Sequence, residues 1–197
     1  IFGLRTIASG EMILDGKKLH FSNAKDAMDY NFALVTEERK FNGMFGKATI
    51  KFNTVIANLE AYKACGMLSN RKMQEAADRE IKTMRTKCVS ADELISALSG
   101  GNQQKVIIGK WLERQPDILL LDEPTRGIDV GAKYEIYQLI INMAKAGKTI
   151  IVVSSEMPEI LGITNRIAVM SNYRLAGIVD TATTDQEALL RLSARYL

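Results

Sequence analysis

LSGGNQQKVIIGKWLERQPDILLLDEPTRGIDV, residues Leu98–Val130, contains the features that decide the fold. Within it, four consecutive large apolar residues, Ile118–Leu121, follow Pro116 and precede two carboxylates. Such a run predicts a strand that is buried on both faces, as in a parallel sheet. Asp122 and Glu123 would then lie at the carboxyl end of that strand, which is the edge where open α/β sheets bind their ligands.

The order of the two acids suggests different roles for them. Asp122, at the strand end, is placed to hold a water molecule of a bound Mg²⁺. Glu123, one residue later, is placed to orient or deprotonate an attacking water. The alternative is that both acids flank a solvated turn, and the Asp-Glu pair alone does not decide between these interpretations.

Ser99, Gly100 and Gly101 precede a segment with helical spacing of apolar residues, Asn102–Arg114. Glycines allow the backbone to approach a ligand closely, and the free N–H groups at the start of a helix favour an anion such as phosphate. The alternative is an ordinary flexible loop with a serine cap. The order of the segments favours phosphate binding: a Ser-Gly-Gly loop, one helix, a buried strand that ends in acids, and then Asp129.

With this order, LSGGNQQK resembles the signature motif of ATP-binding cassette (ABC) ATPases, ILLLDEP resembles Walker B, and GID resembles the D-loop. Together with ALVTEERK and SSEMPEILGITNRIAVM, these motifs are similar to the second cassette of bacterial monosaccharide importers, particularly of the galactose/methyl-galactoside type. The resemblance extends from about Ser9 to the end of the chain. It implies an α/β fold of the P-loop NTPase kind, a truncated cassette with a mostly parallel core sheet, a partial antiparallel β part and a helical subdomain.

The phosphate-binding loop of such ATPases, GxxxxGK[ST], does not occur in these 197 residues, and the first residue is Ile1 rather than Met. We therefore interpret the chain as a piece that lies downstream of Walker A. On this interpretation, one side of the strand Ile118–Leu121 lacks a neighbour, and we expect an apolar surface with an unpaired edge there.

The resemblance divides the chain into three regions. Residues 1–42 correspond to the antiparallel β part and the Q-loop region, and Asp15-Gly16 predicts a hairpin turn within it. Residues 43–113 correspond to the helical subdomain with the signature motif. Residues 114–197 correspond to the RecA-like core portion with Walker B, the D-loop and the switch strand.

ABC cassettes work as head-to-tail pairs, and this implies that the candidate residues serve two different nucleotides. A first set would cover the γ-phosphate of an ATP that the first cassette of the same polypeptide holds: Ser99, Gly100, Gly101 and Gln103. A second set would face a nucleotide bound by this cassette itself: Asp122 on the metal, Glu123 as the catalytic base, and Glu156. Asp129, in the D-loop, and Glu37, in the Q-loop region, complete the nucleotide-binding residues that the resemblance implies.

Two positions depart from the family pattern. Thr36 and Glu37 occupy the place of the Q-loop glutamine, which makes direct metal contact there doubtful. Glu156 follows the strand Thr149–Val153, where most ABC ATPases have a histidine that senses the γ-phosphate; an ionised carboxylate would repel that group. We expect this cassette to contribute mainly its signature motif to a competent site, while its own site is weak or silent.

The function implied is an ATP-hydrolysing subunit, with ATP and Mg²⁺ as cofactors, that powers monosaccharide import. Its partners would be the first cassette, the membrane permease subunits and, indirectly, a periplasmic sugar-binding protein, with the subunit peripheral at the cytoplasmic face of the bacterial inner membrane. Two alternatives remain: a non-transport ABC ATPase that acts on nucleic acid or the ribosome, and a catalytically silent ABC-like module.

Composition bears on these alternatives. The 26 basic and 23 acidic residues give a net charge of +3 with the signs interspersed, which gives no support for nucleic-acid binding. Hydrophobic residues make up 47% and charged residues 25%, typical of a globular protein without a membrane-spanning segment. Cys65 and Cys88 form no metal-ligand pattern, and this cysteine usage is typical of a reducing compartment.

Overall fold

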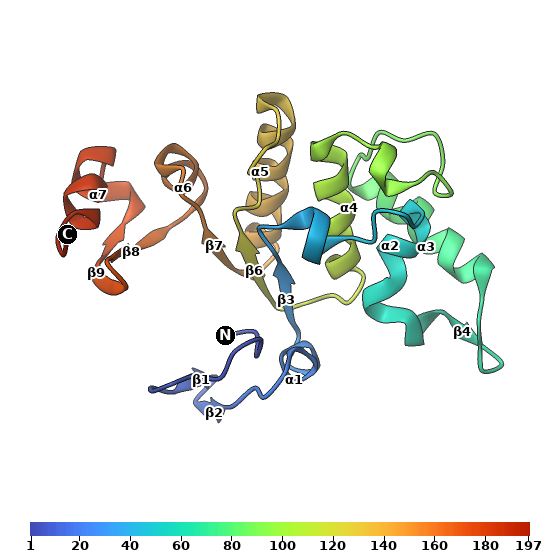
Figure 1. The fold of residues 1–197 in the computed structure, drawn as a ribbon, viewed down its shortest axis with the longest axis horizontal. Helices are drawn as coiled ribbons and strands as arrows, with labels where there is room; N and C mark the ends of the chain where they lie inside the picture. Colours follow the sequence, from blue (N-terminus) through green and yellow to red (C-terminus); the bar gives the residue numbers. More distant parts are fainter.

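The computed structural model describes residues 1–197 and has an α/β fold. Its centre is a three-stranded parallel sheet of β3 (Phe32–Val35), β6 (Ile118–Asp122) and β7 (Thr149–Val153), in the order β3-β6-β7 (Figure 1). In the register of this sheet, Leu119 lies between Ala33 and Ile150. The predicted α/β fold with a parallel core sheet is thus confirmed.

β6 is the central strand, and its apolar run is buried, as predicted. Both of its edges are paired, so the expectation of an unpaired edge at this strand was wrong. The sheet ends instead at β3 and β7. Along β7 the residues alternate between exposed and partly buried, with Ile151 41% and Val153 56% exposed.

A small antiparallel hairpin, β1 (Met12–Leu14) and β2 (Lys17–Leu19), precedes the core sheet, as predicted. Its turn residues Asp15 and Gly16 both have positive φ angles, of 49° and 76°, which the Asp-Gly sequence accommodates. The short helix α1 (Ala24–Asp29) then leads into β3. The region 1–42 therefore contains one strand of the parallel core sheet in addition to the antiparallel part.

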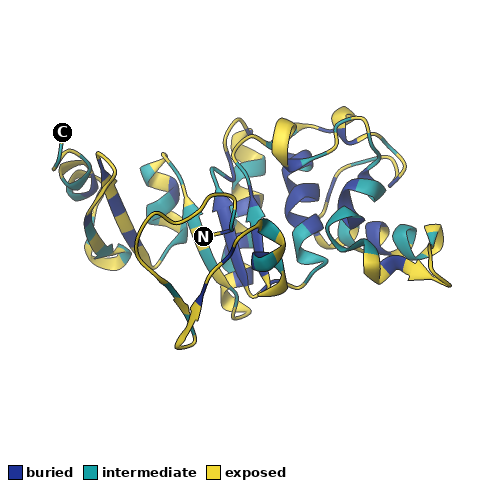
Figure 2. Ribbon diagram, turned by 60° about the horizontal axis from the view of Figure 1, so that its bottom comes forward, coloured by how far each residue is buried: buried dark blue, intermediate teal, exposed yellow.

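The helical region packs beside the sheet, and α4 links the two because its buried residues belong to both cores (Figures 1 and 2). A small antiparallel hairpin interrupts the helices of residues 43–113, the region predicted to correspond to the helical subdomain. The elements of this region are η1 (Arg39–Gly43), α2 (Ile50–Val55), η2 (Ile56–Tyr62), β4 (Lys63–Ala64), β5 (Met67–Leu68), α3 (Asn70–Thr83), η3 (Ile95–Ala97) and α4 (Gly100–Leu112).

After β6 the chain forms α5 against the core, where Ile136 and Ile140 are almost fully buried. A separate antiparallel hairpin, β8–β9, lies beyond β7 and is not paired with it (Figure 1). No helix of the structure is both long and apolar enough to cross a membrane. The elements are α5 (Val130–Lys145), α6 (Met157–Ile163), β8 (Arg166–Ser171), β9 (Arg174–Asp180), η4 (Thr181–Thr183) and α7 (Gln186–Ser193).

Candidate nucleotide site

The Ser-Gly-Gly segment forms the start of α4. Ser99 is the N-cap residue by its backbone angles, but its side chain makes no capping hydrogen bond to the helix. Its hydroxyl instead accepts a hydrogen bond of 2.9 Å from the side-chain amide of Asn102. The first N–H groups of α4 are therefore not satisfied by a cap, and together with the helix dipole they form the kind of donor set that fits a phosphate group.

The two glycines lie where a larger side chain would collide with other segments. A methyl group on Gly100 would lie 2.8 Å from Nη2 of Arg39 and 3.3 Å from the carbonyl oxygen of Gly127. One on Gly101 would lie only 2.4 Å from Cβ of Ala132 in α5. The absence of side chains thus allows α4 to approach both α5 and the loop that follows β6.

Gln103 does not reach the exposed end of α4. The residue is only 5% exposed, and its Nε2 donates hydrogen bonds to the carbonyl oxygens of Ile95 (3.3 Å) and Leu98 (3.0 Å). This geometry does not support the predicted contact of Gln103 with a phosphate. Its side chain instead fixes the loop that leads into the signature segment.

Asp122 ends β6, and Glu123 follows in a left-handed conformation with φ +46°. The N–H of Glu123 donates to the carbonyl oxygen of Val153 (2.8 Å), and its Oε1 accepts from the N–H of Ser155 (2.8 Å). The end of β7 thus holds one oxygen of the Glu123 carboxylate in place. Sequence reasoning placed both acids at this edge, and the structure brings them there beside the end of β7.

Burial, followed by the neighbouring carboxylate of Glu123, raises the pKa of Asp122 above its usual value. A cation bound at this edge would relieve both effects. No group of three or more histidine, cysteine or acidic side chains occurs that could form a complete metal site. This donor set fits Mg²⁺, which is usually held by one or two carboxylates together with phosphate oxygens and water.

Asp129 and Glu156 are both engaged with α5. Asp129 caps this helix, with Oδ1 accepting from the N–H of Ala132 at 3.0 Å. Glu156 forms an ion pair with Lys133, which raises the pKa of the lysine. The residue after β7 that touches Glu123 is therefore Ser155, not Glu156.

Glu37 forms an ion pair with Arg126 in the loop after β6. Its carboxylate is thereby held at this loop, whereas sequence reasoning placed it among the nucleotide-binding residues of the Q-loop region. Beside this pair, the Arg39 guanidinium donates to the carbonyl oxygens of Arg126 (2.9 Å) and Gly127 (3.5 Å).

Sequence reasoning missed two residues of this region, Arg39 and Glu159. Glu159, in α6, is only 3% exposed and accepts hydrogen bonds from the hydroxyls of Thr125 (2.9 Å) and Ser154 (2.5 Å). It thus joins the loop after β6 to the end of β7. The available signal was an acidic residue within the apolar helix-patterned segment MPEILGI, which is unusual unless the acid has partners.

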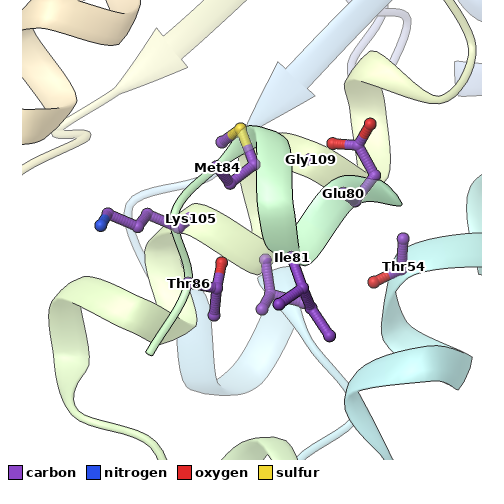
Figure 3. A pocket seen from close by; sticks show the side chains of 8 residues that line it. Thr54, Glu80, Ile81, Met84, Thr86, Lys105 and Gly109 are labelled. Atoms are coloured by element: carbon purple, nitrogen blue, oxygen red, sulfur yellow. The ribbon is translucent and has the colours of Figure 1, made fainter. Parts of the chain in front are cut away.

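A small pocket lies away from these segments, between α3 and α4 (Figure 3). The side chains of Glu80 and Lys105 lie on opposite sides of this pocket, and its interior does not admit a water molecule. It is therefore a feature of helix packing and not a second ligand site.

Comparisons with known proteins agree with this arrangement. The chain is 79% identical to the galactose/methyl galactoside import ATP-binding protein MglA of Treponema pallidum over 197 residues, covering 100% of this chain and 40% of that protein. The MglA protein of Treponema denticola is 75% identical with the same coverage, and that of Clostridium perfringens is 57% identical, with 38% of its length covered. The chain thus spans about 40% of the length of the curated relatives it matches.

Solved structures show the same fold. The ADP conformation of an ATP-binding cassette of an ABC transporter matches 98% of this chain and 76% of its own length, with a TM-score of 0.77 and 17% identity. A dimeric post-hydrolysis state of a cassette bound to ADP and Pi matches 92% of this chain and 77% of its own length, with a TM-score of 0.73 and 22% identity. The sequence pattern of the family described as ABC transporter covers residues 1–126. With more than half of its length matched by that pattern, this chain belongs to the ABC transporter family.

Proposed function

We propose that the complete protein is the ATP-hydrolysing subunit of an importer for galactose or methyl galactoside, and that this chain supplies its second signature segment, Walker B acids and D-loop. The observation that carries this proposal is the 79% identity, over the whole chain, to a relative named for that import. The uncapped start of α4 and the two acids at the end of β6 supply the chemistry such a subunit needs.

In this proposal the start of α4 contributes to the binding of ATP held by the first cassette. The N–H groups after Ser99 would donate to the terminal phosphate, and Gly100 and Gly101 would allow close backbone approach. Gln103 would support the loop from within, through its hydrogen bonds to Ile95 and Leu98. Asp129 would hold the D-loop in place by capping α5.

Glu123 is the proposed base on the other face of the cassette. Because the Ser155 N–H holds its Oε1, the second carboxylate oxygen is available to accept a proton from an attacking water. Asp122 would hold Mg²⁺ through a water molecule, and when bound this ion would neutralise charge on the phosphates.

The environment of Glu123 also supports a weak site on this face. Ser155 and Glu156 occupy the segment after β7, and neither is a cationic donor to a phosphate; Glu156 is instead paired with Lys133. We infer that this cassette serves mainly through the start of α4 and hydrolyses weakly or not at all at its own acids. Its partners would be the first cassette, the permease subunits and, indirectly, a periplasmic sugar-binding protein, at the cytoplasmic face of the membrane.

The test uses the complete protein with its permease, and measures ATP turnover and galactose uptake. Ser99→Arg, which fills the start of α4, is expected to lower turnover about 100-fold, whereas Glu123→Gln leaves most of it. Exposed controls are Ser90→Arg and Glu75→Gln, which should match the wild type. The opposite pattern, with turnover abolished by Glu123→Gln and intact in Ser99→Arg, would reverse the assignment of the two sites. A wild-type protein that hydrolyses ATP without galactose uptake would refute the proposed importer.

A further inference from the structure

Arg39 lies where three separate segments meet. It begins η1, the turn after β3, and its side chain reaches the loop that follows β6. Nη1 donates to the carbonyl oxygen of Arg126 at 2.9 Å, and Nη2 contacts that of Gly127 at 3.5 Å. A guanidinium is suited to this because its planar fork presents donors in fixed directions to two adjacent acceptors.

The third segment is the start of α4. A methyl group on Gly100 would lie 2.8 Å from Arg39 Nη2 and 3.4 Å from its Cζ, so the guanidinium packs directly on the Gly100 backbone. The Gly127 carbonyl oxygen would lie 3.3 Å from the same methyl group. Gly100 therefore lies against both the Arg39 guanidinium and the Gly127 carbonyl oxygen to which that guanidinium donates.

A second link joins the same segments. Glu37, two residues before Arg39, forms an ion pair with Arg126, whose carbonyl oxygen accepts from Arg39. The Nε of Arg39 is buried without a hydrogen-bond partner, so the side chain is held by its two terminal nitrogens alone. These contacts determine how the loop after β6 lies against the start of α4.

We propose that Arg39 is a positioning residue that fixes Arg126 and the D-loop, Gly127–Asp129, against the signature segment at the start of α4, so that the D-loop and the signature segment engage the neighbouring cassette together. This inference rests on the proposed function, in which the two segments act on one cassette interface. Arg39 itself touches neither nucleotide nor metal in this proposal.

The first test compares Arg39→Ala, Arg39→Lys and Arg39→Met in the complete protein by steady-state ATPase kinetics. Loss of the Arg39 guanidinium should lower kcat about ten-fold while KM for ATP and Tm stay near the wild-type values. The reason is that the D-loop is no longer held against the start of α4, whereas nucleotide binding and folding are unaffected. Lysine should recover part of the loss, since it can donate to one carbonyl, and methionine should not. Lys40→Ala removes the adjacent exposed cation and serves as the matched control.

A second measurement does not depend on turnover. Hydrogen exchange in the complete protein should be about three-fold or more faster at the amides of Arg126 and Ile128 in Arg39→Ala, and unchanged in Lys40→Ala. If the wild type hydrolyses no ATP, the proposed function fails and this measurement alone decides about Arg39. Wild-type kcat and exchange in Arg39→Ala, or a loss of kcat that follows a matching fall in Tm, would overturn the proposal.

Discussion

At the scale of single residues, Glu159 has the most demanding environment near the candidate site. It is the only acidic side chain in the buried set, and its two oxygens accept from the hydroxyls of Thr125 and Ser154. Thr125 follows the Walker B acids and Ser154 precedes the residue that holds Glu123. A buried carboxylate is tolerated only where donors compensate for lost hydration, so these hydroxyls are essential to its placement.

Glu159→Ala should lower the free energy of unfolding by about 2–3 kcal/mol, because it leaves the buried hydroxyl of Thr125 and the partly buried hydroxyl of Ser154 without their acceptor. Glu159→Gln keeps one acceptor oxygen and should lose roughly half as much. Urea unfolding of the chain, followed by circular dichroism, gives both values. Glu187→Ala removes an exposed carboxylate paired with Arg191 on α7 and should change the stability little. If Glu159→Ala lowered the stability as little as Glu187→Ala does, the hydrogen bonds of Glu159 would not stabilise this region.

Gly101→Ala should lower the free energy of unfolding by about 1–3 kcal/mol, because the added methyl group lies within 2.4 Å of Ala132 Cβ and forces α4 and α5 apart. Gly46→Ala is the matched control, since nothing lies within 4 Å of its added methyl group. Thermal unfolding of both variants measures the difference. If Gly101→Ala unfolds at the same temperature as Gly46→Ala, the close approach of the two helices is not a constraint.

The places of Ser99, Gly100, Asp122 and Glu123 in the fold could be predicted from the sequence, because each belongs to a short contiguous motif next to its own helix or strand. Arg39 and Glu159 could not. Arg39 has a partner 87 positions away, in Arg126, and Glu159 has one 34 positions away, in Thr125, and only the folded chain brings these residues together. The orientation of the Gln103 side chain could not be predicted for a related reason: the motif fixes its position in the helix, but the loop packed on the helix determines where its side chain points.

At the scale of elements, α3 and α4 meet across a set of ionisable side chains. Glu113 at the end of α4 accepts from Arg79 of α3 at 2.8 Å and from the Tyr62 hydroxyl of η2. Glu80 of α3 lies beside them, and its Oε2 is buried without a partner. Burial, and then the Glu113 carboxylate, raises the pKa of Glu80 from 4.5 to about 7, and Arg79 only partly opposes this.

This raised pKa predicts a pH-dependent stability. Between pH 4.5 and about 7 the folded state keeps the Glu80 proton while the unfolded state loses it, so the contribution of this group is full below that window and is lost as the pH rises through it. Glu80→Gln, which stays neutral, should therefore stabilise the chain at about pH 8, on the order of 1 kcal/mol after solvent screening, and much less at about pH 5. Thermal unfolding measured between about pH 5 and pH 8 gives the pH dependence of the stability of each variant. Glu75→Gln, exposed on the same helix, should follow the wild-type curve; an identical pH profile for Glu80→Gln would contradict the assignment.

Elements with a strong local pattern were predicted well. The four-residue apolar run of β6 and the Asp-Gly turn of the β1–β2 hairpin each specify their structure locally. The hairpin β4–β5 was not predicted, because each strand has only two residues and carries no alternation to distinguish it from helix. The neighbours of β6 in the sheet were also not predictable, since pairing order depends on the path of the whole chain.

At the scale of the whole molecule, one edge of the core sheet carries exposed apolar residues. β7 pairs only with β6, and its exposed residues include Ile151 and Val153. The neighbouring β8–β9 hairpin adds Met170, Leu175 and Ile178, which are 58%, 52% and 60% exposed. Unpaired strand edges and exposed apolar surface both favour association between copies.

The chain on its own should therefore associate with itself at increasing concentration, as light scattering can measure. Replacing both Ile151 and Val153 by threonine keeps the β propensity while lowering the apolar surface, and should shift the chain toward monomer. Met67→Thr, on the β4–β5 hairpin away from this edge, is the control and should leave the association unchanged. A wild-type chain that stays monomeric at high concentration would contradict this prediction.

Calorimetric titration of Mg-ATP into the 197-residue chain and into the complete protein tests the proposed division between the two nucleotide sites directly. In the proposed function, Ser99, Gly100 and Gly101 contact one nucleotide, Asp122 and Glu123 contact another, and a different segment holds the phosphates of each. We therefore expect binding by the complete protein and no measurable binding by the 197-residue chain. Tight binding of one Mg-ATP by the short chain would contradict it, because that chain would then hold a complete phosphate site of its own.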